Sequence, residues 1–256
     1  MQKGGLRTKG LLKNSEKDRP LLSIVTVVFN GERHLEQTIQ SVINQTYNNI
    51  EYIIIDGGSS DKTIEIIKKY DNKIDFWLSE PDNGIYDAMN KGISLATGEY
   101  IELLNADDWL ELDACEIIKN QILEEHYDVY HGIERFIDSN GNNVNLLAGT
   151  VFTLNTQCLA HETCFIHKSI YEKYKYDINY KSAADYDLIC KLNKNGTSFK
   201  FVERILLNFR LDGMSSSIRG IFEGYLVRYK YGYLSKRDFL LRKVYYTLKG
   251  FIQKKK

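Results

Sequence analysis

Two neighbouring acids that follow an apolar run are the residues of this sequence best suited to hold a cation. Asp107 and Asp108 come directly after Leu103-Leu104-Asn105-Ala106. Adjacent carboxylates at the end of a buried strand repel each other and lose hydration, and a bound cation would offset both costs. A site with few protein oxygens, completed by phosphate oxygens, suits Mg²⁺ or Mn²⁺. The alternative is that one acid caps the next helix and the other is solvated.

Two further acids stand where they could act on a ligand. Asp56 opens the polar, glycine-rich loop that runs to Ser60, where a carboxylate can accept a hydrogen bond from a ribose hydroxyl or a base edge. A turn or cap role is its alternative, and Asp61 behind it is assigned to helix capping. Asp185 precedes an apolar run, so its position alone favours a helix N-cap.

The segments that must position these acids are short apolar runs that alternate with helical patterns. Four such strand-then-helix units between residues 21 and 108 predict an open, mostly parallel α/β sheet, in which ligands bind beyond the carboxyl ends of the strands. The loops that matter are then 29–32, 56–61, 80–84 and 105–109. We expect strands at 21–29, 50–55, 75–78, 100–104 and 199–209, helices at 85–96 and 185–193, and a turn at 139–142.

Composition predicts a globular protein, because 43% of the residues are hydrophobic and 27% charged. The net charge is zero, but the charges are unevenly distributed along the sequence: residues 218–256 hold eleven basic residues and two acidic ones. We therefore expect a flexible lead-in at 1–20, a main domain at 21–217 with halves 21–115 and 116–217, and a basic tail at 218–256.

The sequence has no signal-peptide pattern and no apolar run long enough to span a bilayer, which predicts a cytoplasmic protein. The four cysteines form no CxxC pair and are expected to be buried thiols in a reducing compartment.

Two long stretches resemble a known family. Residues 23–67 (SIVTVVFNGERHLEQTIQSVINQTYNNIEYIIIDGGSSDKTIEII) and 79–110 (SEPDNGIYDAMNKGISLATGEYIELLNADDWL) are similar to the GT-A family-2 glycosyltransferases that build bacterial polysaccharides, closely over residues 21–115. A looser similarity continues through His161-Glu162-Thr163 and Ala183-Ala184-Asp185. The usual family pair is HQ where this chain has HE.

The resemblance implies a GT-A (Rossmann-like) fold and an inverting transfer of sugar from a nucleotide-diphosphate sugar, expected to be a UDP-sugar. The acceptor would be a hydroxyl of a saccharide or lipid-linked saccharide. Asp185 would be the catalytic base, Asp108 with Asp107 would hold Mn²⁺ or Mg²⁺, and His161 and Glu162 would lie on the acceptor side. A satisfied buried histidine is the alternative for His161. The residues expected to contact the donor are Thr26, Phe29, Asn30, Glu32, Asp56, Asp82, Asn83, Lys91, Asn105 and Asp107.

Two departures from the family pattern affect the site. Many relatives have Asp where this chain has Asn105, and some supply a late metal-binding His, whereas no His follows His167 here. Arg210 or Asp212 could shape that region instead.

The basic tail interleaves aromatic and aliphatic residues, from Phe222 to Leu248 and Phe251, with its charges. This pattern suits an amphipathic surface on an anionic membrane, and a helical cap packed on the domain is the alternative. No nucleic-acid-binding motif is present. A non-catalytic sugar-nucleotide-binding or scaffolding subunit remains an alternative function. A dinucleotide oxidoreductase is disfavoured because no GxGxxG follows the first apolar run.

Overall fold

The computed structural model describes residues 1–211 and 218–253, and the side chains of 218–219 and 247–253 are not among what it describes. Within that part of the chain, ten strands form one sheet in the order β1-β4-β3-β2-β5-β9-β7-β10-β6, with β8 paired to β7. Strands β4, β3, β2 and β5 are parallel to one another, as are β7 and β10, and the remaining pairs are antiparallel. The strands are β1 (Gln2–Gly4), β2 (Leu22–Val28), β3 (Ile50–Asp56), β4 (Phe76–Ser79), β5 (Tyr100–Asn105), β6 (Trp109–Leu110), β7 (Val129–Ile137), β8 (Asn143–Leu147), β9 (Phe165–His167) and β10 (Phe199–Arg210).

Helices cover both faces of this sheet, as the continuous apolar strands require. All seven residues of β2 are buried, and its alternate side chains enter two separate cores. Helices α1, α2 and α4 pack on one core, and α3, α5 and α6 on the other. The helices are α1 (Leu35–Ile43), α2 (Thr63–Lys69), α3 (Ile85–Leu95), α4 (Ala114–Glu124), α5 (Lys168–Lys173), α6 (Ala184–Lys194), α7 (Ile218–Lys230) and α8 (Lys236–Gln253), with short 3₁₀ turns η1 (Leu6–Lys9), η2 (Val151–Thr153) and η3 (His161–Thr163).

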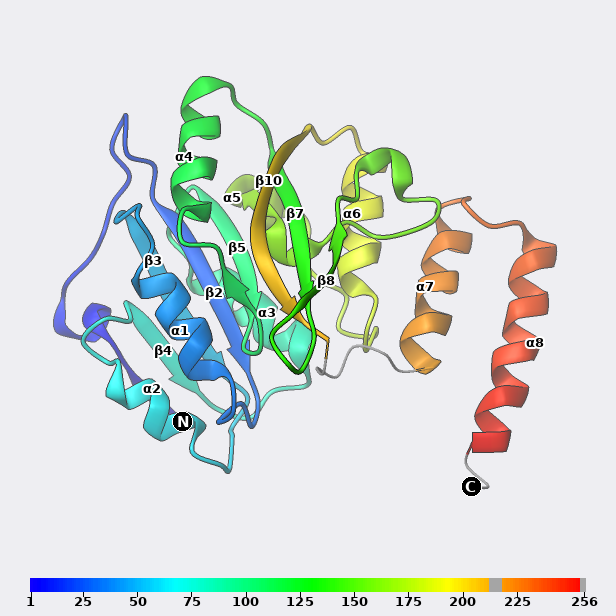
Figure 1. The fold of residues 1–256 in the computed structure, drawn as a ribbon, viewed down its shortest axis with the longest axis horizontal. Helices are drawn as coiled ribbons and strands as arrows, with labels where there is room; N and C mark the ends of the chain where they lie inside the picture. Colours follow the sequence, from blue (N-terminus) through cyan, green and yellow to red (C-terminus); the bar gives the residue numbers. More distant parts are fainter. Residues whose placement is uncertain (212–217, 254–256) are drawn as a thin grey trace.

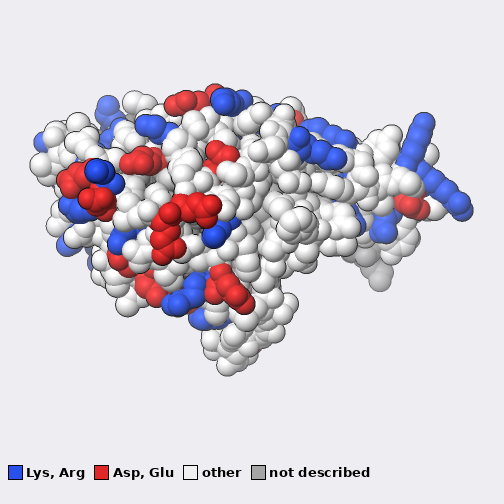
Figure 2. Space-filling view, turned by 90° about the horizontal axis from the view of Figure 1, so that it is seen from above, with Lys and Arg blue, Asp and Glu red and all other residues white. Residues whose placement is uncertain are grey.

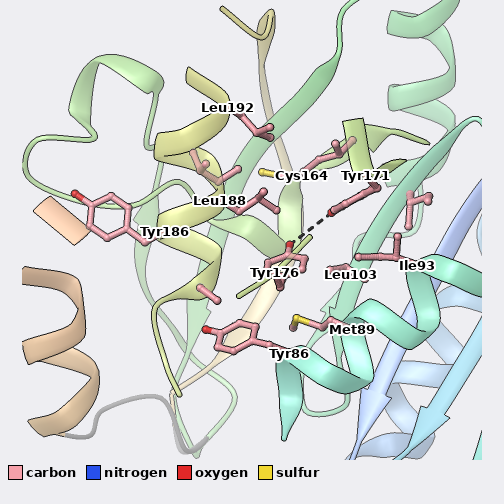
Figure 3. Packing of buried hydrophobic residues seen from close by; sticks show 14 of the residues in the cluster. Tyr86, Met89, Ile93, Leu103, Cys164, Tyr171, Tyr176, Tyr186, Leu188 and Leu192 are labelled. Carbon is pink, nitrogen blue, oxygen red and sulfur yellow. Dashed lines mark hydrogen bonds between the residues drawn. The ribbon is translucent and has the colours of Figure 1, made fainter. Parts of the chain in front are cut away.

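The second core joins the two halves of the main domain. Figure 3 shows Tyr86 and Met89 of α3 facing Tyr176, and Leu188 and Leu192 of α6 entering the same cluster. The Tyr86 and Tyr176 rings stack with centroids 5.7 Å apart. The stack holds the segment between α5 and α6 against α3, the helix that follows β4.

The N-terminal segment is not the flexible lead-in that its composition predicts. Strand β1 pairs with the edge strand β4, and the Arg7 guanidinium bonds the buried Glu51 carboxylate at 3.1 Å. Lys13 likewise reaches Asp75 at 2.8 Å. The sequence pattern did not predict this attachment, because it depends on backbone pairing and ion pairs rather than on an apolar run.

The C-terminal segment forms two antiparallel helices at one end of the molecule (Figure 1). Helix α7 lies between α6 and α8, and its Val227 is fully buried. No helix in the described part of the chain has the length and apolar content that crossing a membrane requires. All four cysteines are free thiols: Cys115, Cys164 and Cys190 are buried as predicted, whereas Cys158 is partly exposed.

Candidate active site

The carboxyl ends of the parallel strands bring the predicted loops to one edge of the sheet, the lower edge in Figure 1. Val28 at the end of β2 pairs with Asp56 of β3, and Val27 pairs with Asn105 of β5. The loops after these three strands therefore begin side by side. This is the edge at which open α/β sheets bind ligands.

The loop after β2 is locked to the loop after β3. Asn30 has a φ of 52°, and its side-chain oxygen accepts the Ser60 amide at 2.9 Å. The Glu32 carboxylate accepts the Lys62 amide at 3.0 Å. Phe29, in contrast, is 67% exposed, so its ring stands free at the rim and could stack on a planar ligand group.

Asp56 is fully buried and organises its own loop. Its carboxylate accepts hydrogen bonds from the Gly58 and Ser59 amides and from the hydroxyls of Ser59 and Ser79. A ligand group that bonded Asp56 would have to replace the exposed-side donor, Ser59. The Asp61 carboxylate accepts the amide of Thr63, the first residue of α2, but the N-cap of that helix is Lys62, which makes no side-chain capping bond, so Asp61 is not the cap that was predicted.

Thr26 does not reach the rim. It lies two residues before the end of β2, is fully buried, and its hydroxyl is 3.1 Å from the Tyr52 hydroxyl. Because side chains alternate along a strand, Thr26 lies on the same face of the sheet as Ile24 and Val28, which is the face that α1, α2 and α4 cover. The prediction that its side chain contacts the donor is therefore not supported by its position.

The loop after β4 presents a small charged group. Asp82 accepts the Gly84 amide, and its other oxygen lies against Gly57, where a Cβ would overlap it. Asn83 is exposed, with its amide bonded to Asp87. Lys91 reaches Glu80 at 3.0 Å and Asp87 at 3.7 Å, which fixes its ammonium behind this loop.

The two adjacent acids after β5 differ in their surroundings. Asp107 is partly exposed, whereas Asp108 is 1% exposed and accepts the Arg210 amide at 2.9 Å with one oxygen. The other oxygen, Oδ2, is buried and has no hydrogen-bond partner. The Arg210 guanidinium bonds the Asp107 carbonyl and lies over the Trp109 ring, so Arg210 does shape this region. Asp212 lies outside the described residues.

This pair fits a cation held by few protein oxygens. Burial and the charges of Glu162 and Asp107 raise the pKa of Asp108 well above its ordinary value, which a divalent cation would reverse. The orphaned Asp108 Oδ2 is a hard oxygen ligand of the kind that Mg²⁺ and Mn²⁺ prefer. Among the described residues, no three His, Cys, Asp or Glu side chains are arranged as a complete metal cage. Ligand oxygens would have to complete the shell.

Two buried acids beneath this edge were missed by the sequence reasoning. Glu102 on β5 is fully buried with neither carboxylate oxygen bonded, and Glu134 on β7 is 3% exposed. Burial first, and then the charge of Glu162, raise the pKa values of both, that of Glu134 to about 9. A Glu on an otherwise apolar strand was the available signal. Nothing in the sequence indicated that the two strands bring these acids toward Glu162.

A continuous chain of polar contacts connects the β5 loop to α6. The Asn105 amide donates to Glu162 at 2.8 Å, and the other Glu162 oxygen is 3.0 Å from His161 Nδ1. His161 Nδ1 is also 3.3 Å from Asp185, whose second oxygen accepts the Tyr86 hydroxyl at 3.0 Å. The predicted donor side and acceptor side are therefore neighbours in space.

Within this network of polar contacts, His161 and Asp185 carry opposite charges. Burial would lower the pKa of His161, but Glu162 and Asp185 raise it to about 10. Burial would raise the pKa of Asp185, but His161 and the Tyr86 hydroxyl hold it below its usual value. Both groups are therefore ionised near neutral pH. Ala183 occupies the N-cap position of α6, and no side chain caps it, so Asp185 is not the cap that its position suggested.

Comparison with known proteins agrees with this arrangement. Residues 23–181 match the family described as Glycosyl transferase family 2. The chain is 40% identical to an uncharacterised glycosyltransferase of Haemophilus influenzae over 131 residues, which are 50% of this chain and 52% of that protein. It is 30% identical to a chondroitin synthase of Pasteurella multocida over 210 residues, which are 79% of this chain and 22% of that protein. The chain thus spans about half of one relative and about a fifth of the other.

Solved structures share the fold at low sequence identity. S. aureus TarS 1-349 in complex with UDP-GlcNAc superposes with a TM-score of 0.68 at 16% identity, covering 87% of this chain and 69% of that one. The mannosyltransferase PcManGT from Pyrobaculum calidifontis, in complex with GDP-Man and Mn²⁺, gives a TM-score of 0.64 at 14% identity, covering 89% and 70%. The expected GT-A fold is confirmed, and the family match over more than half of its residues shows that this chain belongs to glycosyl transferase family 2.

Proposed function

We propose that this protein is an inverting, metal-assisted glycosyltransferase. It would move a sugar from a nucleotide-diphosphate sugar, most simply a UDP-sugar, to a hydroxyl of a saccharide or lipid-linked saccharide during cell-surface polysaccharide synthesis. The observation that carries the proposal is the polar chain from Asn105 through Glu162 and His161 to Asp185. It sets an ionised carboxylate beside the edge at which open α/β sheets bind ligands.

The donor is assigned to the loops after β2, β3, β4 and β5. The exposed Phe29 ring would stack on the base, and the loop ordered by Asp56 would surround the nucleoside. Asp82, Asn83 and Lys91 would line the sugar and phosphate side. A UDP-sugar is supported by the structural likeness to TarS, which was solved with UDP-GlcNAc, and a saccharide acceptor by similarity to a chondroitin synthase.

Asp107 and the orphaned Oδ2 of Asp108 would hold the divalent cation, as predicted for this pair. Bound there, Mn²⁺ or Mg²⁺ would neutralise charge on the leaving diphosphate. Arg210 would keep Asp108 in place through the amide bond to its other oxygen.

Asp185 would act as the base of a direct displacement. The acceptor oxygen bonds to the anomeric carbon from the face opposite the nucleotide, the bond from that carbon to the diphosphate oxygen breaks, and the acceptor proton passes to Asp185. Its lowered pKa keeps the carboxylate ionised and able to accept this proton. His161, held between Glu162 and Asp185, would fix the orientation of the carboxylate from the acceptor side.

The test is to compare Asp185→Asn with Asp107→Ala. With UDP-sugars and Mn²⁺, we expect Asp185→Asn to keep the donor-induced rise in melting temperature and to lose transfer by at least about 10²-fold. Asp107→Ala should lose the metal-dependent rise itself. The exposed Asp177→Asn serves as the matched control and should keep both.

The same measurements distinguish the alternative of a non-catalytic binding subunit. A wild-type protein that shows a metal-dependent melting shift with a nucleoside diphosphate, but no turnover with any donor, would support that alternative. Near-normal transfer by Asp185→Asn would instead refute the base assignment.

We also infer a peripheral position at the inner face of the cell membrane. The inference is supported by the charge division of the sequence, in which the tail carries eleven basic and two acidic residues. A lipid-linked acceptor would be reached from that position.

A further inference from the structure

Helix α8 has an inner face that is packed and an outer face that is not. On the inner face, Phe239 stacks on Tyr229 of α7 with ring centroids 4.7 Å apart, and the Arg242 guanidinium lies 4.3 Å from the Tyr225 ring centroid. These contacts attach α8 to α7. The tail is therefore packed on the protein through one side, as one of the two sequence-based interpretations expected.

The outer face of α8 leaves large apolar side chains in solvent. Leu240, Leu241, Val244 and Tyr245 are each between 49% and 61% exposed. At 100° per residue, the first three lie within an arc of about 100°, opposite Phe239. Leaving such a stripe in water is unfavourable by the hydrophobic effect, so its presence indicates a binding surface.

Basic side chains accompany this stripe. Lys236 and Arg237 line one open groove together with Leu240, Leu241 and Val244. The exposed Lys243 lies on the side of the helix between the stripe and Phe239. Asp238, the acid in residues 236–245, is bonded to Ser235 at the start of the helix. Figure 2 shows Lys and Arg projecting at the end of the molecule that α8 forms.

We propose that the outer face of α8 is the surface through which this protein docks on an anionic lipid bilayer. Leu240, Leu241 and Val244 would enter the boundary between headgroups and acyl chains. Lys236, Arg237 and Lys243 would extend to lipid phosphates, with Tyr245 at headgroup level. This assignment rests on the proposed membrane position and does not depend on the proposed reaction.

Charge favours a bilayer over a second copy of this chain. In a symmetric dimer the same patch meets itself, so Arg237, which lies inside the apolar stripe, would face like charges across the axis. An anionic membrane instead pairs each of these cations with phosphate. The side chains of Leu248 and Phe251, which the sequence pattern also assigns to this surface, lie outside the described residues.

The test is co-sedimentation of the full chain with phosphatidylcholine vesicles, with or without about 30% phosphatidylglycerol. We expect binding to the anionic vesicles alone, weakened by salt. The double variant Leu241→Asp/Val244→Asp should reduce the partition coefficient at least about tenfold. The control Leu112→Asp/Leu123→Asp, which adds the same two charges at exposed leucines outside α8, should bind as the wild type does.

Each outcome decides the proposal. Equal sedimentation of the double variant and the wild type would overturn it, as would a wild type that does not bind anionic vesicles. A concentration-dependent dimer that the double variant abolishes, without vesicle binding, would assign the face to a second copy instead. The thermal unfolding transition of the same samples checks that the variants are folded, and its shift with UDP and Mn²⁺ reports separately on the proposed donor site.

Discussion

Tyr86 is the side chain that connects the hydrophobic core to the candidate base. Its ring stacks on Tyr176, while its hydroxyl donates to Asp185 at 3.0 Å (Figure 3 shows the ring position). Tyr86→Phe keeps the ring and removes the hydroxyl. Because a hydrogen bond to a carboxylate stabilises its ionised form, we expect the pKa of Asp185 to rise in the variant.

The measurement is the pH dependence of kcat/KM. The base must be ionised, so activity is lost as pH falls through its pKa, and this acidic limb should move to higher pH in Tyr86→Phe. A hydrogen bond to a charged group is worth about 1.5–3 kcal/mol, so the limb should move by about one unit or more. Tyr171→Phe, a buried tyrosine that bonds Tyr176 instead, is the control. An unmoved limb would show that Tyr86 has a packing role alone.

Glu134 should make stability depend on pH. Its pKa is raised to about 9 by burial and by Glu162, from an ordinary value of 4.5. Between these two values the folded protein keeps a proton that the unfolded chain releases, so the free energy of unfolding falls as pH rises across that window. Glu134→Gln has no charge to develop. We expect it to be more stable than the wild type by at least about 1 kcal/mol at pH 8, with a smaller difference at pH 5.

Denaturant titrations at the two pH values measure this effect. Glu203→Gln, at an exposed position of β10, is the control. Its free energy of unfolding relative to the wild type should be the same at both pH values. If the Glu134→Gln advantage were the same at both pH values, the buried carboxyl would not be the source of the pH dependence.

The sequence identified the candidate site residues unevenly, for physical reasons. Asp107, Asp108, Asp56 and Asn105 follow apolar strands, and parallel strands end at one edge, so their neighbourhood could be predicted. The route from Glu162 to Asp185 could not, because it depends on the packing of η3 against β5 and β7 and on the hydrogen bond from Tyr86 of α3 to Asp185 of α6. Thr26 lies within the expected strand, two residues before the end of β2, where its side chain is buried beside Tyr52 and not at the rim.

Gly92 sets how closely α3 approaches the sheet. A Cβ at this position would overlap Val25 Cγ1 of β2 and stand 3.3 Å from Ile55 of β3. Gly92→Ala should therefore push α3, with Tyr86, away from the sheet and lower the free energy of unfolding by about 1–3 kcal/mol. Chemical denaturation measures the loss, and activity should fall with it.

Gly224 on α7 is the matched control for this helix substitution. An added Cβ there meets no atom within 4 Å, so Gly224→Ala should stabilise the protein slightly, by up to about 1 kcal/mol, through helix propensity alone. Equal effects of the two substitutions would mean that the approach of α3 to β2 is not as close as described.

The elements themselves were largely predictable where apolar content was high. The expected strands at 50–55, 100–104 and 199–209 each end one residue before the observed ones, and the strand expected at 75–78 is shifted by one residue. Strand β1 was missed because Gln2 and Lys3 have no apolar pattern, and its pairing depends on an exposed edge of β4. The antiparallel insertion of β9 between β5 and β7 is likewise a property of the assembled sheet.

At the scale of the whole molecule, the two ends of the chain support different parts of the site. The N-terminal segment closes the edge of the sheet beside β4 and neutralises the buried Glu51. The C-terminal helix α7 holds the start of α6, because the Glu223 carboxylate accepts the amides of Lys181 and Ser182 at 2.8 Å each. These amides lie just before the helix that carries Asp185.

The two acids of the tail should therefore have unequal effects on catalysis. Glu223 is buried and holds the segment before Asp185, whereas Asp238 is exposed and bonds Ser235 at the start of α8. We expect Glu223→Ala to lower the free energy of unfolding by about 1–3 kcal/mol and to reduce kcat, since two amides lose a charged partner and the base loses its support. Asp238→Ala removes only the carboxylate that accepts the Ser235 hydroxyl, while the Ser235 oxygen still accepts the amide of residue 238, so it should cost less than about 1 kcal/mol with kcat unchanged. Equal kcat values for the two variants would mean that α7 adds stability without positioning the base, and that the catalytic part of the molecule ends before the tail.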